Sequence, residues 1–385
     1  MISAYGINCS EASLYIHIPF CKSLCDYCDF YSIAVKDVNE GFIDSFINAL
    51  INDIKNQINL FGVKKIPSLY IGGGTPSVLG NKIRILLDAL KNLPHYTEFT
   101  IEANPESITE EFLDICRDYG INRLSLGIQT FHEQSRLAVN RTGDAAVLED
   151  RIDLASQYFP DMLSVDLITG LPYQDRKIVL NDIKRALAFC PSHVSLYSLS
   201  VEEGTPLKEK IRHGTVTLPD SDTLDSIWLT GREALLKEGF EHYEVSNFAR
   251  QKAGYPASQK RCLHNIRYWQ MRSWLGAGPA ACGTVIDEES SSATRFTYAD
   301  NVEEYLSKQG TGDSEQITRD TFVRECLLMG FRYIDGPDTV LFKQRFGFTI
   351  EDCIGKTLEK WKAKNKMLFL NSFIYDAFSE LENVI

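Results

Sequence analysis

The sequence predicts an α/β protein that is built on a parallel sheet or barrel, with a second, smaller unit towards its C-terminal end. Short β-branched segments alternate with segments of helical periodicity from the start of the chain to about residue 215. After that point the alternation stops. The length of 385 residues is enough for one large domain and a smaller one.

The predicted strands are short apolar segments, namely Leu14–Ile18, Ser68–Ile71, Phe99–Ala103, Arg123–Ile128, Leu163–Ile168 and Val194–Leu199. The predicted helices between them are Phe42–Leu60, Lys82–Leu93, Glu110–Tyr119, Ala146–Tyr158 and Ile178–Phe189. A helix between successive strands makes those strands parallel, and ligands are then expected beyond their carboxyl ends.

The second half of the chain is organised differently. Helical periodicity returns at Asp222–Glu238 and at Thr318–Met329, and the segment from His264 to Gly283 is rich in aromatic residues and glycine. We therefore expect a core domain over residues 1–239 and a smaller, mainly helical domain over residues 240–385.

Composition and charge exclude several classes of protein. The chain has 40 Lys and Arg against 52 Asp and Glu, a net charge of −12, which argues against nucleic acid as a partner and against broad attachment to anionic lipid. No apolar run approaches the length of a membrane span, and the N-terminus lacks a secretory signal pattern. We expect a cytoplasmic protein, in which ten cysteines need an explanation other than disulfides.

Three of these cysteines are grouped just after the first predicted strand. Cys21, Cys25 and Cys28 have the spacing C-x3-C-x2-C. Three thiolates without a fourth suit an iron–sulfur cluster that keeps one iron open, whereas structural zinc has four protein ligands. A zinc site completed by His17, or three unrelated thiols, remain alternatives on spacing alone.

The surrounding residues resemble a known family. The segment Tyr15-Ile-His-Ile-Pro-Phe-Cys21-x3-Cys25-x-Tyr27-Cys28-x-Phe30 resembles the cluster loop of radical S-adenosylmethionine (SAM) enzymes, in the branch of oxygen-independent coproporphyrinogen oxidases and HemW-type heme chaperones. The resemblance implies an incomplete parallel β/α barrel of radical SAM type. It also implies a [4Fe-4S] cluster on the three cysteines, with SAM chelating the open iron.

The same resemblance implies which residues contact SAM. The segment Gly72-Gly73-Gly74-Thr75-Pro76 follows a predicted strand and resembles the family motif for the amino end of SAM. The implied SAM contacts are Tyr15, Tyr27, Gly73, Gly74, Thr75, Glu102, Gln129, Arg141 and Asp166. One departure follows Arg141, where relatives have a histidine within a few residues and this chain reads Thr142-Gly143-Asp144.

Two features favour the chaperone branch over the oxidase branch. Phe30 stands where the oxidases have a fourth cysteine, and only twenty residues precede Cys21, without the amino-terminal extension of the oxidases. In addition, His264-Asn-x-x-Tyr268-Trp269 resembles the HNxxYW motif of HemW-type proteins, which implies heme contacts for His264, Tyr268 and Trp269. Without the family context, such a histidine is more often a hydrogen-bonded core residue.

The expected function is that of a radical SAM-type heme chaperone, which binds a [4Fe-4S] cluster, SAM and heme and delivers heme to acceptors such as respiratory hemoproteins. The alternatives are an oxygen-independent coproporphyrinogen III oxidase, or a radical SAM enzyme that acts on another porphyrin. No catalytic residue is assigned. We further expect an electron donor such as flavodoxin or ferredoxin, a monomer or cluster-dependent homodimer, and transient approach to the inner face of the membrane.

Overall fold

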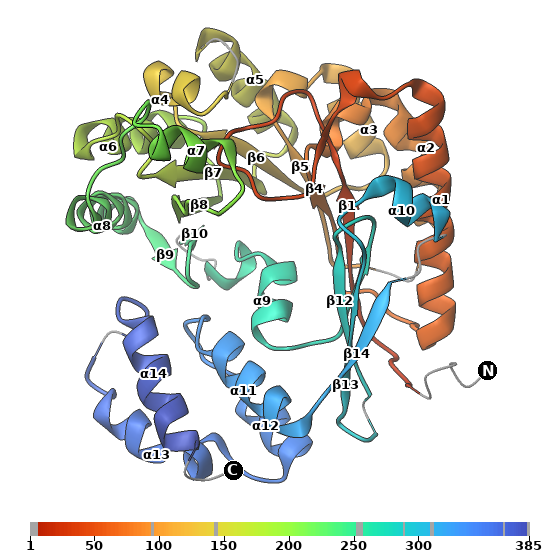
Figure 1. The fold of residues 1–385 in the computed structure, drawn as a ribbon, viewed down its shortest axis with the longest axis vertical. Helices are drawn as coiled ribbons and strands as arrows, with labels where there is room; N and C mark the ends of the chain where they lie inside the picture. The colour runs from red at the N-terminus through yellow and green to blue at the C-terminus, as the bar shows by residue number, and fades with distance from the viewer. Residues whose placement is uncertain are drawn as a thin grey trace.

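A single curved sheet organises the computed structural model, which describes residues 7–93, 96–141, 145–251, 257–287, 289–308, 312–364 and 366–382. The sheet has 12 strands in the order β14-β13-β12-β11-β1-β4-β5-β6-β7-β8-β10-β9. Its two edge strands, β14 and β9, are not paired with each other, so the barrel is open. Helices cover the outer face of the sheet, and a group of helices from the C-terminal part of the chain lies to one side of it (Figure 1).

The middle of the sheet is parallel, as the alternating sequence pattern predicts. Its strands are β1 (Ser13–Ile18), β4 (Ser68–Gly73), β5 (Glu98–Ala103), β6 (Arg123–Gln129), β7 (Leu163–Thr169) and β8 (His193–Ser198). The connecting helices are α1 (Glu40–Phe61), α2 (Ile83–Leu90), α3 (Glu110–Asp118), α4 (Glu133–Ala138), α5 (Ala145–Tyr158) and α6 (Arg176–Leu187). Every strand and helix predicted up to residue 199 is present, with ends that differ by a few residues.

Local signals set these ends. Helix α1 begins after Asn39, whose side chain accepts a hydrogen bond from the Phe42 amide, and it ends at Gly62, which has the left-handed φ of 69°. The spacing of its apolar residues predicts the helix itself, and the buried residues Phe46, Ile47, Leu50 and Ile54 lie on the face turned to the sheet.

The sheet continues beyond residue 239. The added strands are β9 (Phe240–His242), β10 (Asn247–Arg250), β11 (Trp274–Ala277), β12 (Cys282–Ile286), β13 (Ala293–Thr297) and β14 (Asp313–Ile317). β11 pairs in parallel with β1, and β12 to β14 follow as an antiparallel meander. These strands belong to the same sheet as the strands of the first half of the chain. The domain boundary expected between residues 239 and 240 stays a prediction.

Two very short strands and the remaining α-helices complete the described part of the chain. Two strands of two residues each, β2 (Phe20–Cys21) and β3 (Ile33–Ala34), flank the cysteine loop. The helices α7 (Pro206–Arg212), α8 (Ser221–Lys237), α9 (Leu263–Trp269) and α10 (Val302–Ser307) pack around the sheet. The last part of the chain is helical and consists of α11 (Arg319–Gly330), α12 (Thr339–Phe346), α13 (Ile350–Lys360) and α14 (Leu370–Leu381), whereas residues 240–317 of the expected helical domain contain the strands β9 to β14.

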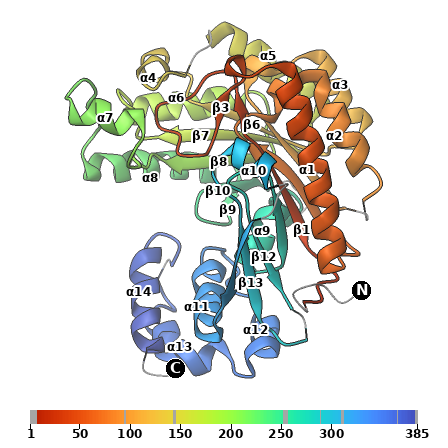
Figure 2. The same ribbon diagram turned by 45° about the vertical axis from the view of Figure 1, so that its right-hand side comes forward.

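The two parts have separate hydrophobic cores. The larger core runs from Ile7 to Tyr305 and fills the space between the sheet and its helices. The smaller core is formed mainly by residues of α11 to α14 and also includes Met271 and Ile286. Helix α9 contacts both β4 and α11, and in two views it lies between the sheet and the helical group (Figures 1 and 2). Among the described helices, none is long and apolar enough to cross a lipid bilayer.

A buried ion pair fixes α9 to the sheet. The Glu98 carboxylate on β5 lies 3.1 Å from Arg123 Nε on β6, and these side chains are 5% and 2% exposed. Glu98 also accepts hydrogen bonds from the backbone amides of Leu263 (3.0 Å) and His264 (2.9 Å) at the start of α9. One carboxylate therefore satisfies both a buried cation and the first amides of a helix.

We predict that Glu98→Ala destabilises the protein strongly. The substitution leaves the Arg123 cation buried without its carboxylate, which costs about 3–5 kcal/mol in comparable cases. The measurement is the free energy of unfolding in urea, with Asp88→Ala as the control because Asp88 forms an exposed ion pair with Lys91. Equal stability of the two variants would show that the Glu98 carboxylate does not hold α9 in place.

Candidate functional site

The polar residues predicted to bind SAM lie at one edge of the sheet because the parallel strands all end there. Gly72 and Gly73 close β4, Glu102 lies near the end of β5, Gln129 closes β6, and Asp166 lies in β7. The cysteine loop follows β1 at the same edge: the amides of Gly74 and Thr75 donate to the carbonyls of Ile18 (2.8 Å) and Phe20 (2.8 Å).

The cysteine loop presents three thiols in different surroundings. Cys21 is 8% exposed, and its Sγ accepts a hydrogen bond from Thr75 Oγ1 at 3.6 Å. The Cys25 Sγ accepts one from Arg141 Nη1 at 3.6 Å, and Cys25 and Cys28 are half-buried. Burial, with the neighbouring thiols, raises the pKa of Cys28 to about 11. A thiolate at Cys28 therefore requires a positively charged partner.

The surroundings of these thiols fit an iron–sulfur cluster better than zinc. Within the described residues, no three His, Cys, Asp or Glu side chains come close enough to hold a single metal ion. His17, the fourth ligand of the zinc alternative, has both ring nitrogens occupied, by Tyr15 Oη (3.0 Å) and by the Tyr31 carbonyl (3.0 Å). Three free cysteines without a fourth protein ligand suit an iron–sulfur cluster that keeps one iron open.

Gly74 allows the backbone to lie directly against Cys21. A Cβ atom at this position would lie 2.9 Å from Cys21 Sγ and 2.8 Å from the Phe20 carbonyl oxygen. Gly73 has a φ of 109°, and a Cβ there would lie 2.8 Å from the His17 ring. The glycines of this segment are thus required by close backbone approach to the cysteine loop, as well as by any approach of SAM.

Arg141 connects the cysteine loop to the strand ends. Its side chain is buried; besides Cys25, it donates to Asn104 Oδ1 at 2.7 Å and to the Gly127 carbonyl. Its Nε lies 3.6 Å from Glu106 Oε1. Asn104 also donates to Thr75 Oγ1 at 2.9 Å, so the glycine segment, β5 and the cysteine loop form one hydrogen-bonded network.

Glu102 and Asp166 are buried carboxyls with raised pKa values. Burial, with the nearby Asp166, raises the pKa of Glu102 to about 7, although Tyr70 Oη and the Gly73 amide donate to it at 2.6 and 3.2 Å. Burial raises the pKa of Asp166 to about 6, and Ser125 Oγ donates to it at 3.0 Å. Ionised, each of them can accept hydrogen bonds from the hydroxyl or ammonium groups of a ligand.

The other predicted SAM residues lie near this edge. The phenol of Tyr15 is bonded to His17, and Tyr27 packs against the buried Val139, Leu171 and Leu207. Gln129 has a left-handed φ of 69° at a register shift in β6, a conformation that non-glycine residues adopt mainly where surrounding structure imposes it. The departure at Thr142-Gly143-Asp144 lies outside the described residues.

The sequence analysis did not identify the residues that hydrogen-bond to the predicted SAM contacts. Asn104 stands in the Ile-Glu-Ala-Asn-Pro segment, two residues after Glu102, and that proximity was the available signal. Tyr70 lies inside an apolar strand and gave no signal. Glu106 Oε2 is buried and has no hydrogen-bond partner among the described residues, which leaves an acceptor beside Arg141 for a ligand group.

The HNxxYW segment forms α9 and is largely closed. His264 is 1% exposed, its Nδ1 is bonded to Ser68 Oγ (3.0 Å), and its Nε2 is bonded to Tyr268 Oη (2.9 Å). Burial, with the nearby Arg267, lowers the pKa of His264 to about 3, so the ring is neutral. His264 also packs on Tyr70 with ring centroids 5.1 Å apart, and Tyr70 in turn donates to Glu102.

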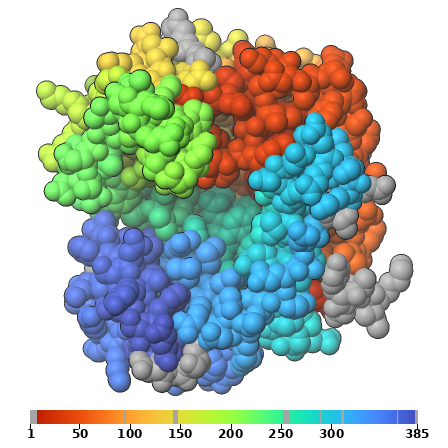
Figure 3. Space-filling view, viewed as in Figure 1, coloured from red at the N-terminus to blue at the C-terminus, as the bar shows by residue number. Residues whose placement is uncertain are grey.

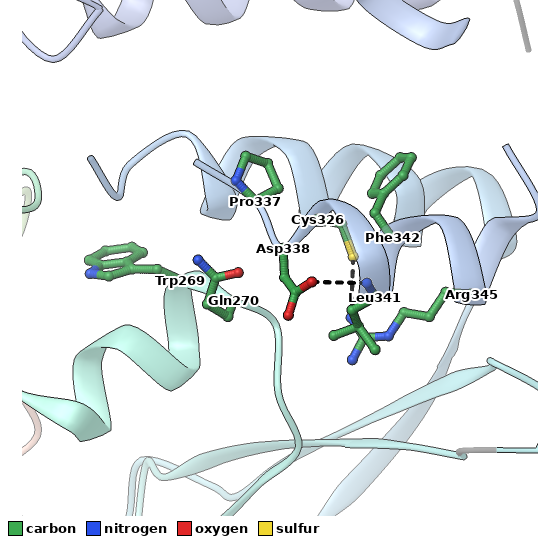
Figure 4. Close-up of a pocket in the computed structure, with 8 residues that line it drawn as sticks. All are labelled: Trp269, Gln270, Cys326, Pro337, Asp338, Leu341, Phe342 and Arg345. Carbon is green, nitrogen blue, oxygen red and sulfur yellow. Dashed lines mark hydrogen bonds between the residues drawn. The ribbon is translucent and has the colours of Figure 1, made fainter. Parts of the chain in front are cut away.

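Trp269 ends α9 at the junction with the helical group. Together with Gln270 it faces Pro337, Asp338 and Leu341 across a cavity of about 10 Å³ (Figure 4). That volume holds one water molecule and no porphyrin. Trp269 Nε1 and Gln270 Oε1 are buried without hydrogen-bond partners among the described residues.

We predict that Gly74→Ala prevents cluster loading without unfolding the chain. The added methyl group would displace Cys21 Sγ or the Phe20 carbonyl, whereas Gly355→Ala, the control, meets no atom within 4 Å. The measurement is iron content and visible absorbance after anaerobic reconstitution, with circular dichroism as the check of folding. Full iron loading of Gly74→Ala would contradict the close approach of Gly74 to Cys21.

We predict that binding of S-adenosylhomocysteine, an unreactive SAM analogue, weakens as the pH falls below about 7. The ribose hydroxyl groups of the analogue donate to the ionised Glu102 carboxylate. The affinity for the analogue is therefore full above the pKa of Glu102 in the folded protein and is lost as the carboxylate is protonated. Calorimetry between pH 6 and 7.5 measures this, and Glu102→Gln is expected to flatten the profile. The exposed Glu111→Gln should retain the pH dependence; a flat wild-type profile would remove Glu102 from the ligand site.

Comparison with known proteins agrees with this geometry. The radical SAM superfamily profile matches residues 15–186. The chain is 31% identical over 353 residues to the heme chaperone HemW of Lactococcus lactis, covering 90% of this chain and 88% of that protein. It is 35% identical over 278 residues to HemW of Escherichia coli, covering 71% of this chain and 70% of that protein.

Two further similarities bear on family and fold. The chain is 33% identical over 334 residues to radical S-adenosyl methionine domain-containing protein 1, mitochondrial, of Mus musculus, covering 84% of this chain and 73% of that protein. Coproporphyrinogen III oxidase (HemN) of Escherichia coli superimposes with a TM-score of 0.77 at 21% identity, covering 96% of this chain and 90% of that one, which shows a common fold. The chain belongs to the radical SAM superfamily and, within it, to the family of the HemW heme chaperones.

Proposed function

We propose that this protein is a heme chaperone, which binds a [4Fe-4S] cluster and SAM at the sheet edge, takes up heme and passes it to acceptor hemoproteins. Membership of the HemW family supports the heme-handling role. The radical SAM profile covers the cysteine loop, the glycine segment and the strand ends that carry Glu102, Gln129 and Asp166.

The observation that carries the proposal is the similarity to HemW heme chaperones, which extends over most of the chain. The cavity next to Glu102 is lined mainly by polar residues, which include Thr100, Ser125, Ser164, Asp166 and Ser195. Such a lining suits the hydroxyl and ammonium groups of SAM.

The exposed position of Phe30 is consistent with a chaperone rather than an oxidase. Its side chain stands where the oxidase branch has a fourth cysteine, and it is 65% exposed. When bound, the cluster and SAM supply the capacity for one-electron cleavage of a carbon–sulfur bond. Cys21, Cys25 and Cys28 would hold the cluster, while Arg141 positions Cys25 and Glu102 accepts hydrogen bonds from SAM.

Heme contacts by His264, Tyr268 and Trp269 stay a prediction from the motif. Iron could reach a nitrogen of His264 only if the hydrogen bond to Tyr268 or to Ser68 opens. If His264 is an axial ligand, His264→Ala changes the Soret band of the bound heme. An unchanged Soret spectrum would reject that role.

The proposal extends to the partners and the location of the chain. A respiratory hemoprotein would be a suitable acceptor, and flavodoxin or ferredoxin a suitable electron donor. Such an acceptor would bring the protein transiently to the inner face of the membrane from the cytoplasm. Whether the chain is a monomer or a cluster-dependent homodimer is part of the same proposal, and sedimentation with and without the cluster tests it.

We predict saturable binding of one heme per chain, followed through the Soret band under anaerobic conditions with reconstituted protein. We also predict that the reduced protein with SAM does not convert coproporphyrinogen III to protoporphyrinogen IX, because Phe30 stands where the oxidases have a fourth cysteine. Product formation, measured by chromatography of the oxidised porphyrins, would favour the oxidase alternative. The absence of saturable heme binding would contradict the proposed heme chaperone function.

A further inference from the structure

Strand β6 ends in a strained turn at Gln129, one of the predicted SAM contacts. The Thr130 amide donates to the Ile128 carbonyl at 2.9 Å, and Gln129 between them has a φ of 69°. A hydrogen bond across one residue with a positive φ forms the rare and strained kind of γ-turn. Such a conformation persists only where neighbouring contacts impose it, and it is concentrated at functional sites.

The turn also shifts the register of β6 against β7. Gly127 pairs with Asp166 and Gln129 pairs with Leu167, so β6 carries one extra residue between these pairs. A Cβ atom at Gly127 would lie 2.8 Å from both Gln129 Nε2 and Asn104 Oδ1. The side-chain amide of Gln129 therefore lies beside the hydrogen-bonded network that joins β5 to the cysteine loop.

Arg136 holds this turn from α4. Its Nη1 donates to the carbonyls of Ile128 at 3.1 Å and Thr130 at 3.2 Å, which are the residues on either side of Gln129. The guanidinium donors are fixed in one plane, so they hold two acceptors at a defined separation. The backbone on both sides of Gln129 is thereby kept in place.

Asp182 holds the same turn from α6. Its carboxylate accepts hydrogen bonds from Thr130 Oγ1 at 2.5 Å and from the Phe131 amide at 2.9 Å. Arg185, on the same helix, places the central carbon of its guanidinium 4.3 Å from the centroid of the Phe131 ring. The two residues that follow Gln129 are therefore fixed to α6.

Both holding side chains are closed to solvent. Arg136 is 2% exposed and Asp182 is 3% exposed. The hollow that the space-filling view shows lies between the sheet domain and the helical group (Figure 3). Since Arg136 and Asp182 present almost no surface to a ligand, any effect that they have on SAM must pass through the turn that they hold.

We propose that Arg136 and Asp182 are positioning residues for SAM, which act by imposing the left-handed conformation of Gln129 and so directing its side-chain amide to the ligand. The proposal rests on the proposed function, because SAM binding at the sheet edge is part of that function. The two buried side chains belong to different helices, and both contact the residues that flank Gln129.

The test is a double-mutant cycle on the full, reconstituted chain, in which calorimetry measures S-adenosylhomocysteine affinity. We expect Gln129→Ala and Asp182→Ala each to weaken binding by about tenfold, the effect of about one lost hydrogen bond. Because Asp182 acts through Gln129, the double variant should bind at most about twofold more weakly than either single variant. Asp182→Asn keeps an acceptor for the Phe131 amide and should retain most of the affinity.

The matched control is Asp53→Ala. Asp53 is also a buried carboxylate that accepts hydrogen bonds from two hydroxyls, those of Tyr298 (2.9 Å) and Tyr305 (2.7 Å), but it lies on α1. Any effect of this substitution on affinity should add to that of Gln129→Ala. Thr130→Val, which removes one of the two donors to Asp182, repeats the main cycle with a milder change.

The outcomes separate this proposal from the proposed function. Circular dichroism and iron content show that each variant is folded and loaded. Additive effects of Asp182→Ala and Gln129→Ala, or unchanged affinity in Gln129→Ala, would overturn the positioning role and leave SAM binding in place. Failure of the parent chain to bind S-adenosylhomocysteine would overturn both the positioning role and the SAM site of the proposed function.

Discussion

The buried guanidinium of Arg141 is the interaction on which the cofactor edge depends. It reaches Cys25 in the cysteine loop, Asn104 after β5 and the carbonyl of Gly127 in β6. A buried cation is stabilised by acceptors around it, and the acceptors of the Arg141 Nη groups come from three separate elements. The loop that follows β1 is thereby held to strands that lie two and three positions away in the sheet.

The same principle operates at the other end of the strands. Glu98 joins Arg123 and the start of α9, so the HNxxYW helix is fixed to β5 and β6. Tyr70 then connects the two ends, because its hydroxyl donates to Glu102 while its ring packs on His264. The cofactor edge and α9 are thus joined through neighbouring strands, whereas the helices α11 to α14 have their own hydrophobic core.

Much of the parallel sheet was predictable because short apolar, β-branched segments alternate with longer segments of helical periodicity. The strands β9 to β14 were not, because they have three to five residues each, too few to show a period, and β11 pairs with β1 across most of the chain. The cysteine spacing indicated the cluster loop, and the family resemblance indicated the strand-end residues. Roles such as that of Asn104 depend on contacts between elements, which no local pattern records.

The closed state of His264 illustrates the same limit. Its spacing from Tyr268 and Trp269 identifies the motif, but its hydrogen bond to Ser68 is formed across 196 positions of sequence. Residues that a motif marks for a ligand can therefore be occupied by partners from elsewhere in the fold.

The central claim, that this protein passes heme to an acceptor, is tested most directly by following transfer from the heme-loaded chain to an apo-hemoprotein in stopped flow. A chaperone that hands over its cargo in a complex predicts a transfer rate that rises with acceptor concentration before it saturates. A rate that is independent of acceptor concentration and equal to that of spontaneous heme release would contradict the account.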